Sequence, residues 1–519
     1  MQEQRQKVCR LSQLAQGMTP AKVGQEEILL VRQGDTVHAC GGKCPHYGAP
    51  LAEGVLLGHE VVCPWHNARF DVRTGHLVAP PALDDLPAYQ AEVEGDDVYI
   101  RGAQLARRPK RTGGRKTVLI VGAGAAGEAA AETLRREGFD GRVVMVTPEE
   151  DLPYDRPNLS KDFLAGKAKP EWLPLRSQEF YRQQQIEILK GTRVTALDVR
   201  GRVAHLLPGE KLPFDLCLIA SGGSPRKLSV PGADLAGIFT LRSLADARAL
   251  EAAAAKASRA LIVGAGFLGL EAASALRSRG LQVVVVAPES VPLANILGDG
   301  VGTSLLHLHE EYGVEFHLGR TVQEFRGNSA VQEAVLSDGK RLDIDLAVVG
   351  IGILPVVGFL EGSGLVEGGA VAVDARLQTK AEGVFAAGDV AAVLQGTDGG
   401  RQRVEHWAVA ERQGQHAARA MLGHPGPYEE VPFFWTRQHG VSLKYAGFAQ
   451  GFEAVLYRGD LERRRFLAGY FAGGRLVAAA SIGMGEQFAA AEAILRKKKV
   501  LTPEQFCDPG FDLVTLART

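Results

Sequence analysis

The chain has 519 residues, of which 45% are hydrophobic, so it is long enough for roughly three or four domains with sizeable cores. Its formal net charge of −1 excludes a general electrostatic attraction to nucleic acids or acidic membranes. Its six cysteines are too few for a disulfide framework, and its N-terminus lacks the apolar core of a secretion signal. No apolar run approaches the ~20 residues of a membrane span. We therefore expect a cytoplasmic protein with no membrane span.

Short β-rich runs separated by Gly, Asp and Pro predict a small all-β domain over the first hundred residues or so. Two of its turns contain Cys44-Pro45-His46 and Cys63-Pro64-Trp65-His66. Two thiols and two imidazoles form a four-ligand set, and a Cys₂His₂ set could hold zinc. Zinc fingers, however, place both cysteines in one pair and both histidines in the other, whereas each pair here is mixed.

This mixed arrangement resembles the Rieske [2Fe–2S] family, whose motif is C-x-H followed by C-x-x-H. The resemblance implies that Cys44 and Cys63 bind one iron and that His46 and His66 bind the other. Rieske proteins of high potential carry an additional cysteine in each loop, and neither loop has one here. The resemblance therefore implies a low-potential, ferredoxin-like cluster.

Basic residues dominate the next segment, 104–116, which contains no acidic residue. Like charges repel one another and extend a chain, so we expect a solvated linker. A docking patch for an acidic partner is the alternative interpretation.

Two copies of a glycine-rich strand–turn–helix pattern follow the linker. In each, a buried β-rich run, 117–121 or 260–263, precedes a G-x-G-x-x-G motif and a helical segment. The first glycine makes a tight turn, the second lets the backbone approach a pyrophosphate, and the third lets the helix pack on the strand. The motif glycines are Gly122, Gly124 and Gly127 in the first copy and Gly264, Gly266 and Gly269 in the second. The pattern predicts two dinucleotide-binding α/β domains.

Three further segments, 152–161, 383–389 and 405–407, resemble the ferredoxin reductases of the pyridine-nucleotide oxidoreductase superfamily. They also resemble the apoptosis-inducing-factor-like proteins that carry a Rieske domain. Two residues are thereby implied to bind FAD: Arg156 along the cofactor and Asp389 at its ribityl chain.

The same resemblance implies a catalytic pair, in which Lys161 lies beside the flavin and pairs with Glu271.

The second nucleotide site is predicted to bind NAD(P)H. By the same resemblance, Glu405 and Trp407 line the nicotinamide pocket beside the flavin. Ala287 occupies the usual position of the acid that holds the adenosine ribose, but Glu289 follows and could still reach it. No arginine follows that would grip a 2′-phosphate, so NADH is favoured over NADPH.

The resemblance covers nearly the whole chain. It implies a multidomain fold with an all-β Rieske domain, two α/β Rossmann-like domains for FAD and NAD, and a C-terminal α+β domain. The predicted parts are the Rieske domain at 1–103, the basic linker at 104–116, the FAD-binding domain at 117–240 and 353–424, the NAD(P)H-binding domain at 241–352, and the C-terminal α+β reductase domain at 425–519.

Missing cysteines separate this chain from related enzymes. Disulfide reductases of the superfamily need a redox cysteine after the first Rossmann helix, and none occurs between Cys63 and Cys217. We therefore expect a reductase that passes electrons from NADH through FAD to the [2Fe–2S] cluster and on to an external acceptor, whether an oxygenase, a cytochrome or a small molecule. A redox-sensing or regulatory flavoprotein of the apoptosis-inducing-factor type is the alternative. The resemblance also allows a homodimer.

Overall fold

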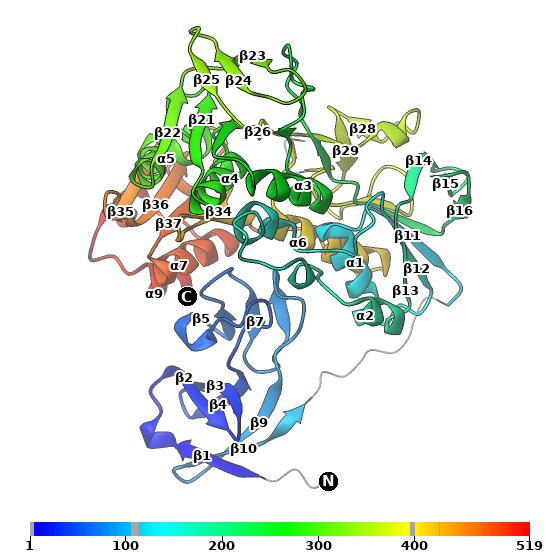
Figure 1. The fold of residues 1–519 in the computed structure, drawn as a ribbon. Helices are drawn as coiled ribbons and strands as arrows, with labels where there is room; N and C mark the ends of the chain where they lie inside the picture. The colour runs from blue at the N-terminus through cyan, green and yellow to red at the C-terminus, as the bar shows by residue number, and fades with distance from the viewer. Residues whose placement is uncertain (1–4, 105–113, 395–399, 425, 519) are drawn as a thin grey trace. The chain divides into compact units, whose positions relative to one another are not determined.

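The computed structural model describes residues 5–104, 114–394, 400–424 and 426–518, and their elements are labelled in Figure 1. The chain forms two compact units. Unit 1 comprises residues 1–110, 445–458 and 466–519, and unit 2 comprises residues 111–444 and 459–465.

The N-terminal part of unit 1 consists of two antiparallel sheets, with strand orders β1-β10-β9-β4-β3-β2 and β5-β6-β7-β8. Strand β3 shows why the larger sheet has two apolar faces: Leu29 and Val31 join one hydrophobic cluster, while Ile28 and Leu30 join another. The strands are β1 (Gln6–Arg10), β2 (Gly17–Val23), β3 (Glu26–Gln33), β4 (Thr36–Gly41), β5 (Val55–Leu57), β6 (Glu60–Val62), β7 (Arg69–Asp71), β8 (Leu77–Ala79), β9 (Ala88–Glu94) and β10 (Asp97–Gln104).

The C-terminal part of unit 1 combines strands with short helices. Strands β36 and β37 pair in antiparallel fashion, and helix α7 packs on β37 through buried alanines and Phe488. The elements are β35 (Ala454–Asp460), β36 (Arg465–Ala472), β37 (Arg475–Ile482), α7 (Gly485–Arg496), α8 (Pro503–Cys507) and α9 (Leu513–Arg518).

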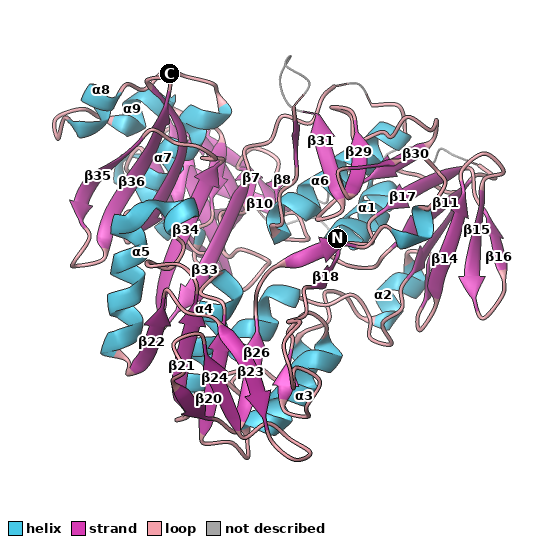
Figure 2. Ribbon diagram, turned by 90° about the horizontal axis from the view of Figure 1, so that it is seen from above, coloured by secondary structure: helices cyan, strands magenta, loops and turns pink. Residues whose placement is uncertain are grey.

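Unit 2 contains two parallel five-stranded sheets with similar arrangements, and most of their strands are labelled in Figure 2. In each, the strand before a glycine motif is central, and the chain then passes through a helix to the strand beside it. The first sheet has the order β13 (Ile186–Leu189), β12 (Arg142–Val146), β11 (Thr117–Val121), β17 (Leu216–Ile219), β30 (Val384–Ala386); the second has β19 (Ile238–Phe239), β26 (Leu346–Val349), β20 (Arg259–Val263), β21 (Gln282–Ala287), β22 (Val314–Leu318).

Smaller sheets and helices complete unit 2. Its helices are α1 (Ala125–Arg136), α2 (Gln178–Gln183), α3 (Leu244–Ala254), α4 (Phe267–Ser278), α5 (Ala294–Glu311) and α6 (Trp407–Met421). The other strands are β14 (Arg193–Asp198), β15 (Val203–Leu207), β16 (Lys211–Pro213), β18 (Gly223–Pro225), β23 (Val322–Arg326), β24 (Glu333–Leu336), β25 (Arg341–Asp343), β27 (Ile353–Pro355), β28 (Val366–Glu367), β29 (Ala370–Val373), β31 (Ala391–Leu394), β32 (Arg401–Gln402) and β33 (Phe433–Gln438), with β34 (Val441–Gly447) running from unit 2 into unit 1.

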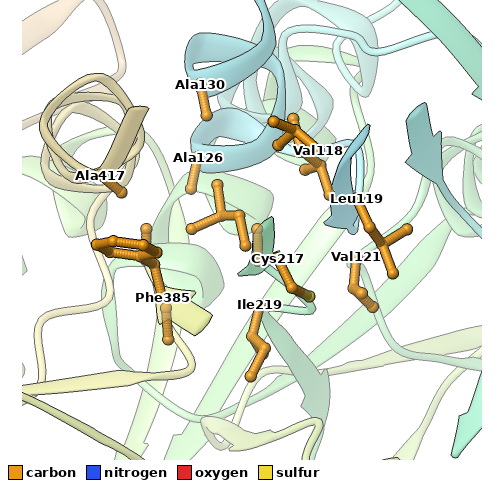
Figure 3. Packing of buried hydrophobic residues seen from close by; sticks show 14 of the residues in the cluster. Val118, Leu119, Val121, Ala126, Ala130, Cys217, Ile219, Phe385 and Ala417 are labelled. Atoms are coloured by element: carbon orange, nitrogen blue, oxygen red, sulfur yellow. The ribbon is translucent and has the colours of Figure 1, made fainter. Parts of the chain in front are cut away.

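The core of the first parallel sheet packs against α1, and α1 packs against α6 (Figure 3). The two helices approach so closely that a Cβ at Gly414 would lie 2.1 Å from the carbonyl oxygen of Ala126. Cys217 is fully buried in this core on β17, where burial raises the pKa of its thiol, so it is a packing residue rather than a redox group.

The expected fold class is confirmed: a β-rich N-terminal part, two parallel α/β sheets and a C-terminal part of strands followed by helices. Strand β10 continues to Gln104, and most of the predicted basic linker, 105–113, lies outside the described residues. Within the described ranges, no helix is long and apolar enough to cross a membrane.

Candidate cofactor sites

Two loops of unit 1 present the predicted cluster ligands, and both are built on the same turn. In the first loop, Cys44 N–H donates to the Ala49 carbonyl and Gly48 N–H donates to the Cys44 carbonyl, each over 2.9 Å. In the second, Cys63 N–H donates to the Ala68 carbonyl over 2.8 Å and Asn67 N–H donates to the Cys63 carbonyl over 3.3 Å. The fourth residue after each cysteine has a positive φ, as glycine and asparagine tolerate best.

This shared turn brings like ligands together. The Nδ1 atoms of His46 and His66 face each other at 3.1 Å, and the thiols of Cys44 and Cys63 are hydrogen-bonded to one another. The four side chains therefore form a thiol pair and an imidazole pair. No set of three or more ligating side chains converges on one point within the described residues.

The pairs fit a [2Fe–2S] cluster better than a single tetrahedral zinc, because each iron of a Rieske centre takes only two protein ligands. The neighbouring Cys63 thiol and burial raise the pKa of Cys44, so a bound cation would be needed to hold Cys44 as a thiolate. Burial lowers the pKa of His46 to about 4, which keeps its imidazole neutral, the form that binds metals.

The cluster loops also contact the C-terminal part of unit 1. Asn67, next to His66, donates from its side-chain amide to the Glu492 carboxylate on α7 over 2.6 Å. One turn further along α7, Arg496 forms an ion pair of 3.1 Å with Glu60 on β6. The ring of Trp65, between the ligands of the second loop, is 47% exposed.

The glycine motifs of unit 2 show two different reasons for lacking a side chain. A Cβ on the first or third glycine would collide with a backbone oxygen at 1.9–2.5 Å, whereas a Cβ on the second would have nothing within 4 Å. The colliding glycines are Gly122, Gly127, Gly264 and Gly269, and the open ones are Gly124 and Gly266. The open positions lie at the N-termini of α1 and α4, where a pyrophosphate fits.

Lys161 and Glu271 meet across 2.8 Å, although 110 residues separate them. Lys161 lies within the one-turn π helix η4 (Leu159–Phe163), where its backbone angles are not helical. Its ammonium also donates to the Pro157 carbonyl. The Glu271 carboxylate on α4 accepts a second bond from the Ser160 hydroxyl, and Thr436 on β33 donates to its other oxygen. The pair is largely buried, with 15% of the lysine side chain and 7% of the glutamate side chain exposed.

The two residues expected along the FAD, Arg156 and Asp389, both contact Arg242. Arg156 forms an ion pair of 2.8 Å with Glu149 and donates to the Arg242 carbonyl. Arg242 in turn donates to the Asp389 carboxylate over 2.8 Å. Arg242 was not predicted from the sequence, because it lies 147 residues from Asp389 and belongs to no local motif.

The residues expected at the nicotinamide are less enclosed. Glu405 is exposed and bonds to Arg403, while Trp407 begins α6 and donates from its indole to Glu411. Glu289 follows β21 and is exposed, without an ion pair to any other described residue.

Unit 2 also contains an aromatic cluster that was not predicted from the sequence. Phe434 on β33 packs against Phe267, the residue after Gly266, with ring centroids 4.6 Å apart. The ring of His406, immediately before Trp407, has its centroid 4.4 Å from that of Phe434. Single aromatic residues have no sequence signature, so only the fold could bring these three together.

Comparison with protein families matches almost the whole chain. Residues 116–414 match the family "Pyridine nucleotide-disulphide oxidoreductase", residues 4–90 match "Rieske [2Fe-2S] domain", and residues 433–517 match "Reductase C-terminal".

Some similar proteins match nearly all of this chain, and others match about three quarters of it. Apoptosis-inducing factor 3 of Homo sapiens is 40% identical over 95% of this chain and 85% of its own length. The ferredoxin–NAD(+) reductase component of the anthranilate 1,2-dioxygenase system of Burkholderia cepacia is 34% identical over 76% of this chain and 98% of its own. The crystal structure of the ferredoxin reductase for the CYP199A2 system from Rhodopseudomonas palustris superposes with a TM-score of 0.75 at 33% identity, covering 78% of this chain and all of that one.

These matches confirm the resemblance found in the sequence. They imply FAD, NADH and a [2Fe–2S] cluster as the cofactors, which the thiol pair, the imidazole pair and the two open glycine positions fit. The chain therefore belongs to the pyridine nucleotide-disulphide oxidoreductase family, as an oxidoreductase that carries an N-terminal Rieske [2Fe–2S] domain and a reductase C-terminal domain.

Proposed function

We propose that this protein passes electrons from NADH through FAD to its Rieske cluster and then singly to an external acceptor. The observation that carries the proposal is the presence, in one chain, of two Cys/His loops and two glycine motifs whose second glycine faces open space. When bound, FAD would supply both hydride and one-electron chemistry, and the [2Fe–2S] cluster would supply one-electron chemistry.

Each predicted residue is assigned a part in this proposal. Lys161 and Glu271 are the catalytic pair: the carboxylate holds the ammonium in place, and the ammonium provides positive charge toward the flavin. The cluster ligands are Cys44, His46, Cys63 and His66; the dinucleotide contacts are Gly122, Gly124, Gly127, Arg156, Lys161 and Asp389 for FAD, and Gly264, Gly266, Gly269, Glu289, Glu405 and Trp407 for NADH.

The acceptor is proposed to be a one-electron carrier or an oxygenase. Support comes from the relatives, which include ferredoxin reductase components named for dioxygenase systems. None of the six cysteines, all of which the structure describes, forms a disulfide, in keeping with a proposed cytoplasmic location. The homodimer and the domain boundaries given above stay predictions.

Loss of one cluster ligand tests the proposed route. We expect His66→Ala to abolish the Rieske signal in electron paramagnetic resonance while FAD content and reduction of the flavin by NADH persist. Transfer to cytochrome c, a one-electron acceptor, should fall at least tenfold, as measured by stopped-flow absorbance.

His59→Ala is the matched control, because His59 is an exposed histidine of the same small domain. Should the His66 variant reduce cytochrome c as fast as the parent, the cluster is off the path. The regulatory role suggested by the apoptosis-inducing-factor-type relative would then take precedence.

A further inference from the structure

A row of hydrogen-bonded polar side chains leads from Glu271 to the surface of unit 2. Thr436 donates to the Glu271 carboxylate over 2.7 Å, and the Gln438 amide donates to the Thr436 hydroxyl over 3.0 Å. Gln438 then meets Nε2 of His309 on α5 at 2.9 Å, and Nδ1 of His309 meets Nε2 of His439 at 3.0 Å.

The inner members of this row are deeply buried. Thr436 and Gln438 are each 1% exposed, and His309 is fully buried. Buried polar groups cost free energy unless they are hydrogen-bonded, so a row of this length must be satisfied throughout. His439, in the turn between β33 and β34, is only half-buried and stacks on Tyr312, with ring centroids 4.2 Å apart.

The chemistry of each group fixes the direction of every bond. The ionised Glu271 only accepts, so the single proton of the Thr436 hydroxyl points to it, and the hydroxyl oxygen must accept from the Gln438 amide nitrogen. The amide oxygen then faces His309, whose Nε2 must carry the proton. The bare Nδ1 of His309 therefore accepts from Nε2–H of His439.

Burial keeps both imidazoles neutral, lowering the pKa of His309 to about 4 and that of His439 to about 3. The donors of His439, His309, Gln438 and Thr436 consequently all point along the row in the direction of the Glu271 carboxylate. Aligned hydrogen bonds polarise one another, so each link strengthens the next. The Gln438 amide has no labile proton to pass on, so the row holds Glu271 in place rather than conducting protons.

We propose that His309 and His439, acting through Gln438 and Thr436, are positioning residues that fix the Glu271 carboxylate and thereby the Lys161 ammonium. This inference rests on the proposed function, in which that ammonium lies beside the flavin. It assigns a catalytic influence to α5 and to the β33–β34 turn.

The first test cuts the row at its last link. Thr436→Val keeps the shape of the side chain but removes the donor, and Thr436→Ser keeps the donor as the matched control. We expect Thr436→Val to slow reduction of the flavin by NADH about tenfold, the usual effect of losing a hydrogen bond to a charged group. The flavin reduction potential should fall, because a less firmly held cation stabilises the reduced flavin less, and Thr436→Ser should stay near the parent.

The second test asks whether His309 acts through Thr436. His309→Leu alone should lower both the rate and the potential, and His309→Gln, which restores an N–H donor, should recover part of each. In the double variant Thr436→Val/His309→Leu, both readings should equal those of Thr436→Val alone, because the row is already cut. Thermal unfolding of every variant separates loss of stability from these readings.

Lys161→Met, measured in parallel, keeps the two proposals apart. If it leaves the potential and the rate unchanged, the role proposed for Lys161 is wrong. If Lys161→Met lowers the potential and the rate while Thr436→Val lowers neither, the role proposed for the row is refuted and that of Lys161 stands. The same conclusion follows if the effects of Thr436→Val and His309→Leu add fully.

Discussion

Glu411 is an acid enclosed in the protein interior. It lies on α6, one turn after Trp407, is 2% exposed and accepts a bond from the Trp407 indole. Burial, reinforced by the negative charge of Asp155, raises its pKa well above the ordinary range. Glu128 on α1 is also fully enclosed, and burial together with Glu132 raises its pKa in the same direction. These acids keep their protons in the folded state over a pH range in which the unfolded chain releases them.

This shift predicts a pH-dependent stability. As pH rises above the unfolded value near 4.5, the unfolded chain loses the Glu411 proton while the fold must retain it. The free energy of unfolding therefore falls, by up to about 1.4 kcal/mol per pH unit, until the raised pKa is passed. Glu411→Gln should lose less stability than the parent between pH 6 and pH 9 in thermal unfolding. Glu382→Gln, at an exposed position, is the control; a Glu411→Gln profile parallel to that of the parent would contradict the argument.

Local motifs account for the site residues that the sequence could predict. The roles predicted for Cys44, His46 and the motif glycines rest on spacings of a few residues and on the family resemblance that those spacings carry. Arg242 and Thr436 reach their partners over 147 and 165 residues. Neither residue type is unusual where it stands, so only the folded chain could identify them.

At the scale of elements, repetition is the main device of this fold. The two cysteine loops share one turn, and in both parallel sheets the glycine-motif strand is central and the chain passes through a helix to the strand beside it. Continuous apolar runs made strands such as β11 predictable to the residue, because buried parallel strands need no polar alternation. The interrupted π turn at Lys161 was not predictable from local patterns, because the partner of Lys161, Glu271 on α4, lies 110 residues away.

The two kinds of motif glycine predict two different losses. In Gly266→Ala the new methyl meets open space, so unfolding should be unchanged while the affinity for NADH falls about tenfold or more. In Gly269→Ala the methyl would lie 2.1 Å from the Gly264 carbonyl oxygen, so the fold should lose about 1–3 kcal/mol. Calorimetric unfolding measures the loss of stability, and titration with NADH measures the loss of affinity. If the NADH affinity of Gly266→Ala stays within threefold of the parent, the second glycine motif has only a structural role.

At the scale of the whole molecule, unit 1 joins the first and last parts of the chain. The contacts of Asn67 with Glu492 and of Glu60 with Arg496 connect residues more than 400 positions apart. Sequence patterns specify each part but not their junction, because both faces are built from ordinary polar residues. The junction places α7 against the residue that follows a proposed cluster ligand.

Removing the acid at this junction should affect both stability and the cluster. Glu492→Ala would leave the buried Asn67 amide without its acceptor, at a cost of about 1–3 kcal/mol. The g-values of the cluster should shift, since Asn67 follows His66 directly. Glu486→Ala, exposed on the same helix, is the control for both measurements. Unchanged unfolding and an unchanged spectrum in Glu492→Ala would show that the Asn67–Glu492 contact affects neither stability nor the cluster.

The carboxylate of Glu271 also bears on the order in which the protein is made. Its partners come from residues 160, 161 and 436. A chain leaves the ribosome N-terminus first and folds domain by domain, so both nucleotide-binding sheets are synthesised before β33. Until that strand emerges, Glu271 lacks the Thr436 donor. The Glu271 site is thus completed only late in the synthesis of unit 2.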